Sequence, residues 1–375
     1  MASRTTPPIT EIGAAVVGTG IIGEVHVEAL RRLGVPVHGV VGSSHARAVE
    51  RATALGLPPA YESFEAMLAD PRVEVVHITS PNHLHYAQAK AALAGGKHVV
   101  CEKPLTMTST ESGELVRLAQ RSGLVNAVNF NLRFYPIVQH VHGIVAGGEL
   151  GEVRLVSGHY LQDWLLLDSD WNWRVDPAVG GELRATSDIG SHWMDLTSFL
   201  IGHRIKSVMA DLATFIKRRN GRDVRTEDAG TVLVRYEGGA QGAFTVSQVS
   251  AGRKNSLVFE IDGAQSAAAW SSDRPDELWL GHRGRPSELL LRDPALLNEE
   301  GRRATWLPGG HAEGFGDTFK ALYAAVYGAV AAGGPGTGYP TFADGHDSML
   351  VLEAVARSSR EQRWVDVARD VKVAR

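Results

Sequence analysis

The sequence contains little cysteine, no long apolar run and no excess of basic charge. Cys101 is the only cysteine among 375 residues, which excludes an intrachain disulfide and a cysteine-rich zinc site. Lys and Arg total 38 against 42 Asp and Glu, a net charge of −4, so sequence-independent binding to nucleic acid has no electrostatic support. The apolar stretch 321–334 is shorter than the roughly 20 residues that span a bilayer, and the polar first ten residues lack the apolar segment of a secretory signal. We therefore expect a soluble cytoplasmic protein with no membrane or nucleic-acid partner.

The first part of the chain alternates short apolar runs with helical patterns. The predicted strands are continuously apolar, as in strands buried on both faces of a parallel sheet: 14–17, 37–41, 73–78, 98–101 and 124–130. The segments between them have helical periodicity: 22–33, 45–55, 64–69, 83–94 and 108–122. Strict alternation of strand and helix predicts a doubly wound α/β domain.

A different pattern begins after Ile144. Strands are predicted with few helices between them, at 152–161, 207–215, 231–236, 241–250, 256–262, 277–280 and 288–291. Helices are predicted at 188–201, 313–332 and 343–360. This pattern predicts a second, α+β domain with a mainly antiparallel sheet, and we place the two domains at residues 1–135 and 136–375.

Residues 18–23, Gly-Thr-Gly-Ile-Ile-Gly, lie between a predicted strand and a predicted helix. In this context Gly18 permits a tight turn, Gly20 lets the backbone approach a pyrophosphate, and Gly23 lets the helix pack on the strand. The first helical turn, which includes Ile21 and Ile22, offers backbone N–H groups and a partial positive charge to the phosphates. The segment predicts a dinucleotide site, and the alternative is a tight turn without a ligand.

The end of the second predicted strand bears on the choice of dinucleotide. An acidic residue at this place usually binds the ribose 2′-hydroxyl of NAD. This chain has no acidic residue there and carries Ser43, Ser44 and Arg47, whose hydroxyls and guanidinium can hold a 2′-phosphate. The sequence therefore favours NADP over NAD, and the alternative is that Arg47 only solvates the helix that begins there.

Two motifs carry candidate catalytic groups. Lys103, in the sequence Glu-Lys-Pro, follows a predicted strand, and the carboxyl ends of such strands border the ligand crevice of doubly wound folds. Asp188, His192 and Asp195 have the spacing i, i+4 and i+7, which places them on one face of an α-helix. Two carboxylates beside an imidazole can orient it and raise its proton affinity, as a general base requires. The alternatives are a helix N-cap beside a structural histidine, and a metal site with three ligands.

Four of the eight tryptophans lie within 30 residues of one another: Trp164, Trp171, Trp173 and Trp193. Flat apolar rings with a polar edge suit the C–H faces of a sugar ring. Nearby polar residues could bind the sugar hydroxyls: Asp163, Asp170, Asn172 and Arg174. The alternative is an aromatic core or subunit interface.

Together these motifs resemble those of the glucose-fructose oxidoreductase / inositol dehydrogenase / rhizopine-catabolism family of NAD(P)-dependent dehydrogenases. Beyond the glycine turn, the resemblance rests on Thr-Ser-Pro-Asn-x-x-His at 79–85, Glu-Lys-Pro at 102–104 and Asn-Leu-Arg-Phe-Tyr-Pro at 131–136. It continues with Asp-Ile-Gly-Ser-His-Trp-Met-Asp at 188–195 and Tyr-Pro-Thr-Phe-Ala-Asp-Gly at 339–345. The resemblance covers nearly the whole chain.

The resemblance implies a Rossmann domain followed by an α+β domain with a large, open, mainly antiparallel sheet, whose free face forms homodimers or homotetramers. It implies the catalytic set Lys103, Asp188 and His192. It also implies that four residues line the cofactor with Lys103: Ser80, Asn82, His85 and Glu102. Substrate would contact Asp195 and Lys103, Arg133 would belong to either site, and we add Trp164, Trp173 and Arg174 to the substrate-binding residues.

The implied activity is oxidation of a secondary hydroxyl of a sugar, sugar derivative or cyclitol by hydride transfer to NADP or NAD, or the reverse reduction. Two other classes stay open: a catalytically silent regulator that senses NAD(P), and a hydrolase or lyase that oxidises its sugar only transiently. The presence of Lys103, Asp188 and His192 favours an enzyme over a sensor. No strong basic cluster near the predicted site calls for a phosphorylated substrate, so we expect an uncharged one.

Overall fold

The computed structural model describes residues 8–369. The first seven residues, where the sequence predicts no secretory signal, lie outside the described residues. By its internal contacts the chain divides into two compact units. One unit comprises the residues up to Asn131 together with Gly316–Met349, and the other comprises Leu132–Phe315 together with the residues from Leu350 onward. This division differs from a single boundary at 135/136, because the late segment Gly316–Met349 groups with the first unit.

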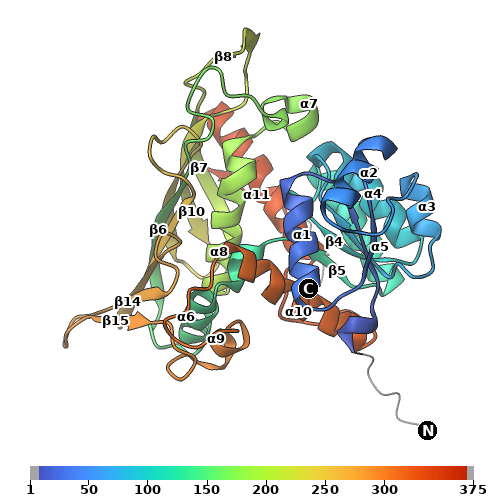
Figure 1. Ribbon diagram of the computed structural model, residues 1–375. Coiled ribbons are helices and arrows are strands. Elements are labelled where there is room, and N and C mark those ends of the chain that lie inside the picture. The colour runs from blue at the N-terminus through green and yellow to red at the C-terminus, as the bar shows by residue number, and fades with distance from the viewer. Residues whose placement is uncertain (1–7, 370–375) are drawn as a thin grey trace. The chain divides into compact units, whose positions relative to one another are not determined.

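The first unit is built on a five-stranded sheet (Figure 1). Its strands are β1 (Ala14–Val17), β2 (Val37–Val41), β3 (Val75–Ile78), β4 (His98–Cys101) and β5 (Asn126–Val128), in the spatial order β2-β1-β3-β4-β5. All neighbours pair in parallel. The chain reverses its direction of winding between β1 and β3, and ligands of such sheets bind outside the carboxyl ends of the strands at this switch point. The doubly wound α/β prediction is confirmed.

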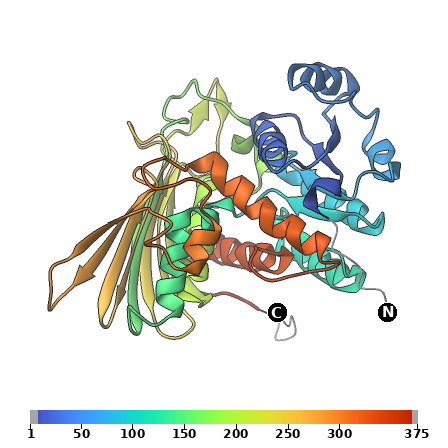
Figure 2. The same cartoon turned by 60° about the horizontal axis from the view of Figure 1, so that its bottom comes forward.

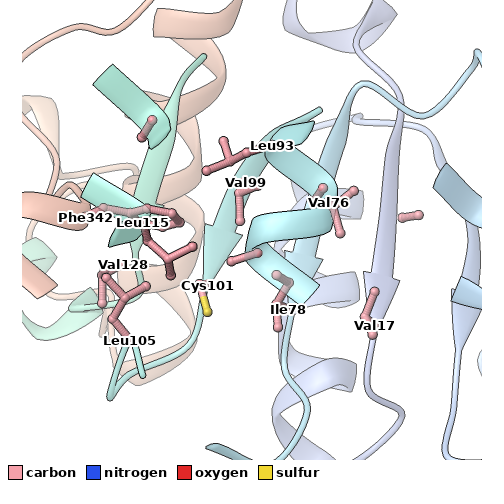
Figure 3. Close-up of a cluster of buried hydrophobic side chains, with 14 of the residues drawn as sticks. Val17, Val76, Ile78, Leu93, Val99, Cys101, Leu105, Leu115, Val128 and Phe342 are labelled. Carbon is pink, nitrogen blue, oxygen red and sulfur yellow. The ribbon is translucent and has the colours of Figure 1, made fainter. Parts of the chain in front are cut away.

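Five helices connect the strands: α1 (Ile21–Arg32), α2 (His45–Ala54), α3 (Phe64–Ala69), α4 (Asn82–Ala94) and α5 (Ser109–Ser122). Their apolar residues and those of the strands form one buried cluster, in which Val76, Val99 and Leu115 are fully enclosed (Figure 3). Cys101 lies in the same cluster, and burial raises the pKa of its thiol well above the usual value. The thiol is therefore a packing group of the sheet rather than a nucleophile.

The late segment contributes α10 (Phe315–Ala331) and the first part of α11 (Phe342–Glu361) to the first unit. Phe342 is fully buried in the apolar cluster (Figure 3). A Cβ on Gly345 would lie 2.6 Å from Val128, so this glycine permits α11 to approach β5 closely. Ser112 Oγ and His346 Nδ1 lie 2.8 Å apart and connect α5 with α11.

The second unit is built on a nine-stranded sheet, which Figure 2 shows obliquely. In spatial order its strands are β15 (Glu288–Leu291), β14 (Glu277–His282), β13 (Ser266–Ser271), β12 (Ser256–Gly263), β6 (Val153–Leu161), β11 (Gln241–Ser247), β10 (Ala229–Tyr236), β7 (Ile205–Ala213) and β16 (Val365–Asp366). Only β6 and β11 pair in parallel. The predicted α+β domain with a large, mainly antiparallel sheet is confirmed.

Helices α6 (Pro136–Ala146) and α8 (Ser191–Ile201) lie on one face of this sheet (Figure 1). A π-helical turn, η4 (Thr186–Gly190), runs directly into α8. The short elements of the chain are η1 (Ile9–Glu11), η2 (Asn131–Phe134), η3 (Trp173–Val175), α7 (Pro177–Gly180), β8 (Arg218–Arg219), β9 (Arg222–Asp223) and α9 (Glu299–Arg303). None of the helices within residues 8–369 is long and apolar enough to cross a membrane.

Candidate active site

Each of the three glycines in the 18–23 turn has a different structural role. Gly18 has a φ of 110°, and a Cβ there would lie 2.5 Å from Thr79 Oγ1. A Cβ on Gly23 would lie 2.2 Å from the Gly18 carbonyl oxygen, so the fold requires glycine at both positions. A Cβ on Gly20 would meet no atom within 4 Å. The backbone at Gly20 is therefore open to a ligand, and α1 begins beside it at Ile21 with no side chain capping its first N–H groups. Dinucleotide phosphates fit this cradle.

The end of β2 leads directly into α2. Ser44 is the N-cap of α2, and its Oγ accepts a hydrogen bond from the Arg47 backbone N–H at 3.4 Å. The Arg47 side chain is exposed, as expected of a residue that meets a ligand from solvent or of one that only solvates the helix. One turn later, Arg51 Nε donates to the Thr19 carbonyl at 3.1 Å, and the same guanidinium pairs with Glu24. Arg51 was not among the residues predicted from the sequence, although its i+4 spacing from Arg47 places it on the same helical face.

The predicted cofactor residues after β3 form bonds that fix the turn. Ser80 Oγ donates to Gln88 at 2.6 Å, and Asn82 is the first residue of α4. His85 is fully buried, with Nε2 at 2.8 Å from the Ser80 carbonyl oxygen and Nδ1 at 2.8 Å from the Pro104 carbonyl oxygen. Burial lowers the pKa of His85. His85 therefore joins the turn after β3 to the Glu-Lys-Pro segment.

Glu102 and Lys103 follow β4 at the carboxyl edge of the sheet, as the sequence predicts. Glu102 Oε1 accepts a hydrogen bond from Asn129 Nδ2 at 2.5 Å and lies 3.1 Å from His26 Nε2. Glu102 Oε2 accepts from the backbone N–H of Lys103 at 3.2 Å. The Lys103–Pro104 peptide bond is cis. The buried carboxylate thus binds the main chain of the lysine that follows it.

Asp188 lies within the π-helical turn that leads into α8. Ala185, at the start of this turn, already has helical φ and ψ, so Asp188 is not an N-cap. A π turn is wider than an α turn, so the one-face argument, which assumes an ideal α-helix, does not carry over unchanged. Asp188 Oδ1 accepts a hydrogen bond from Arg174 Nε at 3.1 Å, and Oδ2 accepts from Gln248 Nε2 at 2.8 Å. Both carboxylate oxygens are therefore held in place.

His192 occupies the first turn of α8 and is 8% exposed. Its ring centroid lies 6.3 Å from that of Tyr160. The Tyr160 hydroxyl donates to Asn255 Oδ1 at 2.9 Å, and burial raises the tyrosine pKa, with smaller contributions from Tyr135 and Asp188. A protonated tyrosine therefore lies beside the imidazole.

Asp195 and Arg133, both predicted to meet substrate, bind each other. Arg133 Nε donates to Asp195 Oδ2 at 2.8 Å, and Nη2 donates to Oδ1 at 2.5 Å. The guanidinium carbon also lies 4.9 Å from the centroid of the Phe199 ring. This bidentate pair neutralises both charges, so any substrate hydroxyl would meet a fixed ion pair rather than a lone carboxylate.

The tryptophans between residues 164 and 193 differ in burial and in their contacts. Trp164 is partly exposed, and the Arg174 guanidinium lies 4.3 Å from the centroid of the Trp173 ring. Trp193 is fully buried, and its Nε1 donates to the Val258 carbonyl at 3.0 Å. Trp193 is therefore a core residue, which corrects its interpretation as a sugar-stacking residue.

Three of the polar residues expected to bind sugar hydroxyls already accept hydrogen bonds from other residues of the protein. Asp163 Oδ2 accepts hydrogen bonds from Lys254 Nζ and the Gly252 N–H. Asp170 accepts from the Leu167 N–H at 2.7 Å. Asn172 accepts from the Arg174 N–H at 3.1 Å. These bonds shape the segment that carries Trp164 and Trp173.

A buried charged cluster anchors the start of the Asp188 turn. Asp228 Oδ1 binds the guanidinium groups of Arg184 and, at 2.9 Å, Arg219. The Glu227 carboxylate accepts hydrogen bonds from the backbone N–H groups of Arg184 and Thr186, and burial raises its pKa. The sequence analysis missed this cluster, because it combines residues 184, 219, 227 and 228, which no motif connects. Among residues 8–369, no group of three His, Cys, Asp or Glu side chains is arranged as metal ligands.

Two family models match this chain in succession. Residues 12–130 match the model described as an oxidoreductase family with an NAD-binding Rossmann fold, and residues 138–268 match the GFO/IDH/MocA C-terminal domain. The chain belongs to the GFO/IDH/MocA family of oxidoreductases.

Curated members of the GFO/IDH/MocA family include two informative relatives. Levoglucosan dehydrogenase of Pseudarthrobacter phenanthrenivorans is 29% identical, over 95% of this chain and 98% of its own length. Trans-1,2-dihydrobenzene-1,2-diol dehydrogenase of Bos taurus is 31% identical, over 74% of this chain and 76% of its own length.

Solved structures of family members are also similar. Levoglucosan dehydrogenase in complex with NADH and L-sorbose has a TM-score of 0.90 at 28% identity, covering 96% of this chain and 99% of that chain. An inositol dehydrogenase homologue from Azotobacter vinelandii, in complex with NADH and myo-inositol, has a TM-score of 0.86 at 28% identity, covering 95% and 97%.

The two compact units of this GFO/IDH/MocA chain divide the predicted site residues between them. All predicted cofactor residues lie in the first unit: residues 18, 20–23, 43, 44, 47, 80, 82, 85, 102 and 103. All predicted substrate residues except Lys103 lie in the second unit: residues 133, 164, 173, 174, 188, 192 and 195. Apart from Lys103, which has both predicted roles, each unit contains the residues of one predicted role.

Proposed function

We propose that this protein is an NAD(P)-dependent dehydrogenase that oxidises a secondary hydroxyl of a sugar, sugar derivative or cyclitol, or reduces the corresponding ketone. The observation that carries the proposal is the Asp188 carboxylate, held by Arg174 and Gln248 one turn before His192. A fixed carboxylate beside an imidazole suits general base catalysis on a hydroxyl. The relatives described above are named for levoglucosan or for a diol or are complexes with L-sorbose or myo-inositol, and they support a polyhydroxylated ring as substrate.

The proposed roles follow from the chemistry of hydride transfer. When bound at the 18–23 turn, the dinucleotide supplies the hydride acceptor or donor. His192 takes the hydroxyl proton during oxidation, and Asp188 orients the His192 imidazole. Lys103 binds the same hydroxyl and stabilises the developing alkoxide, or itself accepts the proton. General base catalysis of this kind contributes roughly 10²–10⁴ in rate.

We also propose that the substrate is uncharged. Arg133 forms a bidentate ion pair with Asp195, and Arg174 binds Asp188. These are the two arginines that the sequence analysis placed at the substrate, and each already neutralises a carboxylate. A phosphate group on the substrate would have to compete with these carboxylates for both guanidinium groups.

For the cofactor, we propose that NADP is preferred over NAD. Ser43, Ser44 and exposed Arg47 at the end of β2 support binding of a 2′-phosphate. The solved relatives contain NADH or NAD⁺, so the preference of this chain would differ from theirs. Arg47→Ala should lower the ratio of kcat/KM with NADP to that with NAD, and an unchanged ratio would exclude this role of Arg47.

The proposed function is tested by removing the two candidate proton-handling groups separately. Lys103→Met and His192→Ala should each abolish most turnover of a substrate that the wild type oxidises, and His192→Ala should retain dinucleotide binding. If both variants keep wild-type kcat, the assignment of the catalytic residues is wrong. If the wild type consumes a sugar without net change in nicotinamide absorbance, the enzyme is a redox-neutral hydrolase or lyase.

We further propose that the free face of the nine-stranded sheet forms a homodimer or homotetramer. In-register residues point to the same side of a sheet, and one row joins Leu233, Ala243, Ser157, Glu260, Ala269, Trp279 and Leu289. Trp279 is 40% exposed and Leu289 is 60% exposed, and Leu155 and Leu291 extend the same face. This exposed apolar surface supports contact with a second copy of the chain.

A further inference from the structure

A chain of buried polar side chains runs through the first unit from α10 to Glu102. The Tyr327 hydroxyl lies 3.1 Å from His77 Nε2, and His77 Nδ1 lies 3.1 Å from His26 Nδ1. His26 Nε2 lies 3.1 Å from Glu102 Oε1. The side chains of Tyr327, His77 and His26 are fully buried. The proposed reaction uses none of these three residues, yet the chain ends at the carboxylate that binds the Lys103 backbone.

The elements of the Rossmann unit bring these residues together. His26 lies on α1, His77 on the central strand β3 and Tyr327 on α10. The two imidazole rings meet edge to face, with centroids 5.3 Å apart, and Tyr323 packs against both rings. The surrounding aromatic side chains exclude water, so the direction of each hydrogen bond is decided by the groups themselves.

The direction of the hydrogen bonds follows from the donors available. Burial raises the pKa of Tyr327 and lowers that of His77, so the tyrosine keeps its proton and the His77 ring is neutral. Within residues 8–369, His77 is the only hydrogen-bond partner of the Tyr327 hydroxyl. If Tyr327 accepted from His77, its own buried O–H would have no acceptor, which costs free energy. Tyr327 therefore donates to His77 Nε2.

This first bond sets the remaining ones. With Nε2 accepting, neutral His77 carries its proton on Nδ1 and donates it to His26 Nδ1. His26 then carries its proton on Nε2 and donates it to Glu102 Oε1, where the Asn129 amide also donates. Each of the two histidines in the chain then has one donor and one acceptor role, and the chain ends on the Glu102 carboxylate.

We infer that His26 is a positioning residue that presents an Nε2–H donor to Glu102, and that Tyr327 fixes this tautomer through His77. The Glu102 carboxylate, held on one oxygen by His26 and Asn129, accepts the Lys103 backbone N–H on the other oxygen. The buried chain thereby orients the segment that carries Lys103. The expected effect of this chain on kcat rests on the proposed function, whereas the predicted histidine tautomers do not depend on it.

The tautomers can be measured without any substrate. We would record ring ¹⁵N shifts of histidine in the full-length protein and assign His26 and His77 from the variants His26→Gln and His77→Gln. The inference predicts a proton on Nε2 of His26 and on Nδ1 of His77. A His26 ring with its proton on Nδ1 alone would overturn it.

The matched tyrosine variants test the origin of the tautomers. Tyr327→Phe should mix the tautomers of both rings, whereas Tyr236→Phe should leave them unchanged. Tyr236 is equally buried and donates its hydroxyl to Thr197 at 2.9 Å in the second unit, so its variant loses a comparable bond elsewhere. Unchanged tautomers in Tyr327→Phe would show that Tyr327 does not determine the tautomers of His77 and His26.

The kinetic measurement separates positioning from a general loss of structure. His26→Leu should lower kcat about tenfold with little change in dinucleotide affinity, because it misorients the Lys103 segment. His26→Gln, which keeps an N–H donor at the position of Nε2, should recover most of that loss. Equal kcat in His26→Leu and wild type, or equal impairment in both His26 variants, would contradict the positioning role. If the wild type oxidises no substrate, the proposed function fails, and the ¹⁵N shifts still decide the inference.

Discussion

At the scale of single residues, the structure assigns partners to side chains that the sequence presents only as candidates. Arg174, which is predicted to bind substrate, donates a hydrogen bond to Asp188, 14 positions further along the chain. Gln248, which no motif includes, donates to the same carboxylate from 60 positions away. A carboxylate with both oxygens bound has few accessible rotamers, so it can orient a neighbouring imidazole at little entropic cost.

Gln248 tests the importance of this arrangement. Gln248→Leu should lower kcat about tenfold with a smaller change in KM, because Asp188 loses the donor on Oδ2 while substrate contacts stay. Gln241→Leu, at the exposed first residue of β11, removes a glutamine side chain at the other end of the strand, and this control should be silent. Steady-state kinetics with one substrate measures both parameters. Wild-type kcat in Gln248→Leu would show that the bond is dispensable.

Glu227 makes a second prediction at this scale. Burial raises its pKa, so the folded state binds this proton more tightly than the unfolded state, and stability is lost as pH rises through the folded pKa. Glu227→Gln has no ionisable group and keeps an oxygen for the backbone donors of Arg184 and Thr186. Its Tm relative to wild type should therefore rise from about pH 5 to about pH 8.

Thermal melts at a series of pH values check this expectation. Half-exposed Glu237 offers the control, because the Tm difference between Glu237→Gln and wild type should not vary with pH in the same way. A Tm difference for Glu227→Gln that is constant across the range would mean that Glu227 is not the group that titrates.

At the scale of elements, apolar runs and helical periodicity predicted most of the first unit, because its strands are buried on both faces and its helices are amphipathic. Several elements of the second unit were missed, including α6, β13 and the edge strand β16. The buried residues 137, 138, 141 and 144 of α6 (Pro136–Ala146) have the spacing of one helical face, so this pattern could have predicted the helix. Strand β13 (Ser266–Ser271) is rich in alanine, which has low strand propensity, and only its pairing with β12 and β14 defines it.

The site was predictable to the extent that it lies in local motifs. The 18–23 turn and the Asp188–His192 pair were predicted from residue spacing, and Lys103 was predicted from its place after a strand. The ion pair of Arg133 with Asp195 joins residues 62 positions apart, and the chain from Tyr327 to Glu102 joins four separate elements. Contacts of this kind depend on tertiary packing, which a single sequence does not encode in any local pattern.

The glycine turn gives a prediction at the element scale. Gly20→Ala should leave the Tm unchanged, because its Cβ meets no protein atom, but should weaken dinucleotide binding about tenfold or more, because the methyl group lies where phosphate approaches. Gly23→Ala should instead lower the Tm, because its Cβ would meet the Gly18 carbonyl. Thermal melts and fluorescence titration separate the two effects. Wild-type affinity in Gly20→Ala would place the phosphates elsewhere.

At the scale of the whole molecule, the chain comprises a dinucleotide-binding unit and a unit with an open sheet. One face of that sheet has no helix among the described residues (Figure 2), and Leu233 and Leu289 are exposed on it. If that face contacts a second copy, the double variant Leu233→Glu and Leu289→Lys should yield monomers in light scattering. Leu296→Lys changes an equally exposed leucine outside the sheet and should keep the wild-type mass. A wild-type mass in the double variant would exclude this face as the interface.

The central claim is that this protein oxidises a hydroxyl with a nicotinamide cofactor. The most direct test is nicotinamide absorbance during incubation of the purified protein with NADP or NAD and a panel of aldoses, glycosides, anhydrosugars and inositols. We predict reduction of the cofactor with at least one of these compounds and a higher kcat/KM with NADP. No change in absorbance across the panel, with dinucleotide binding confirmed, would contradict the account.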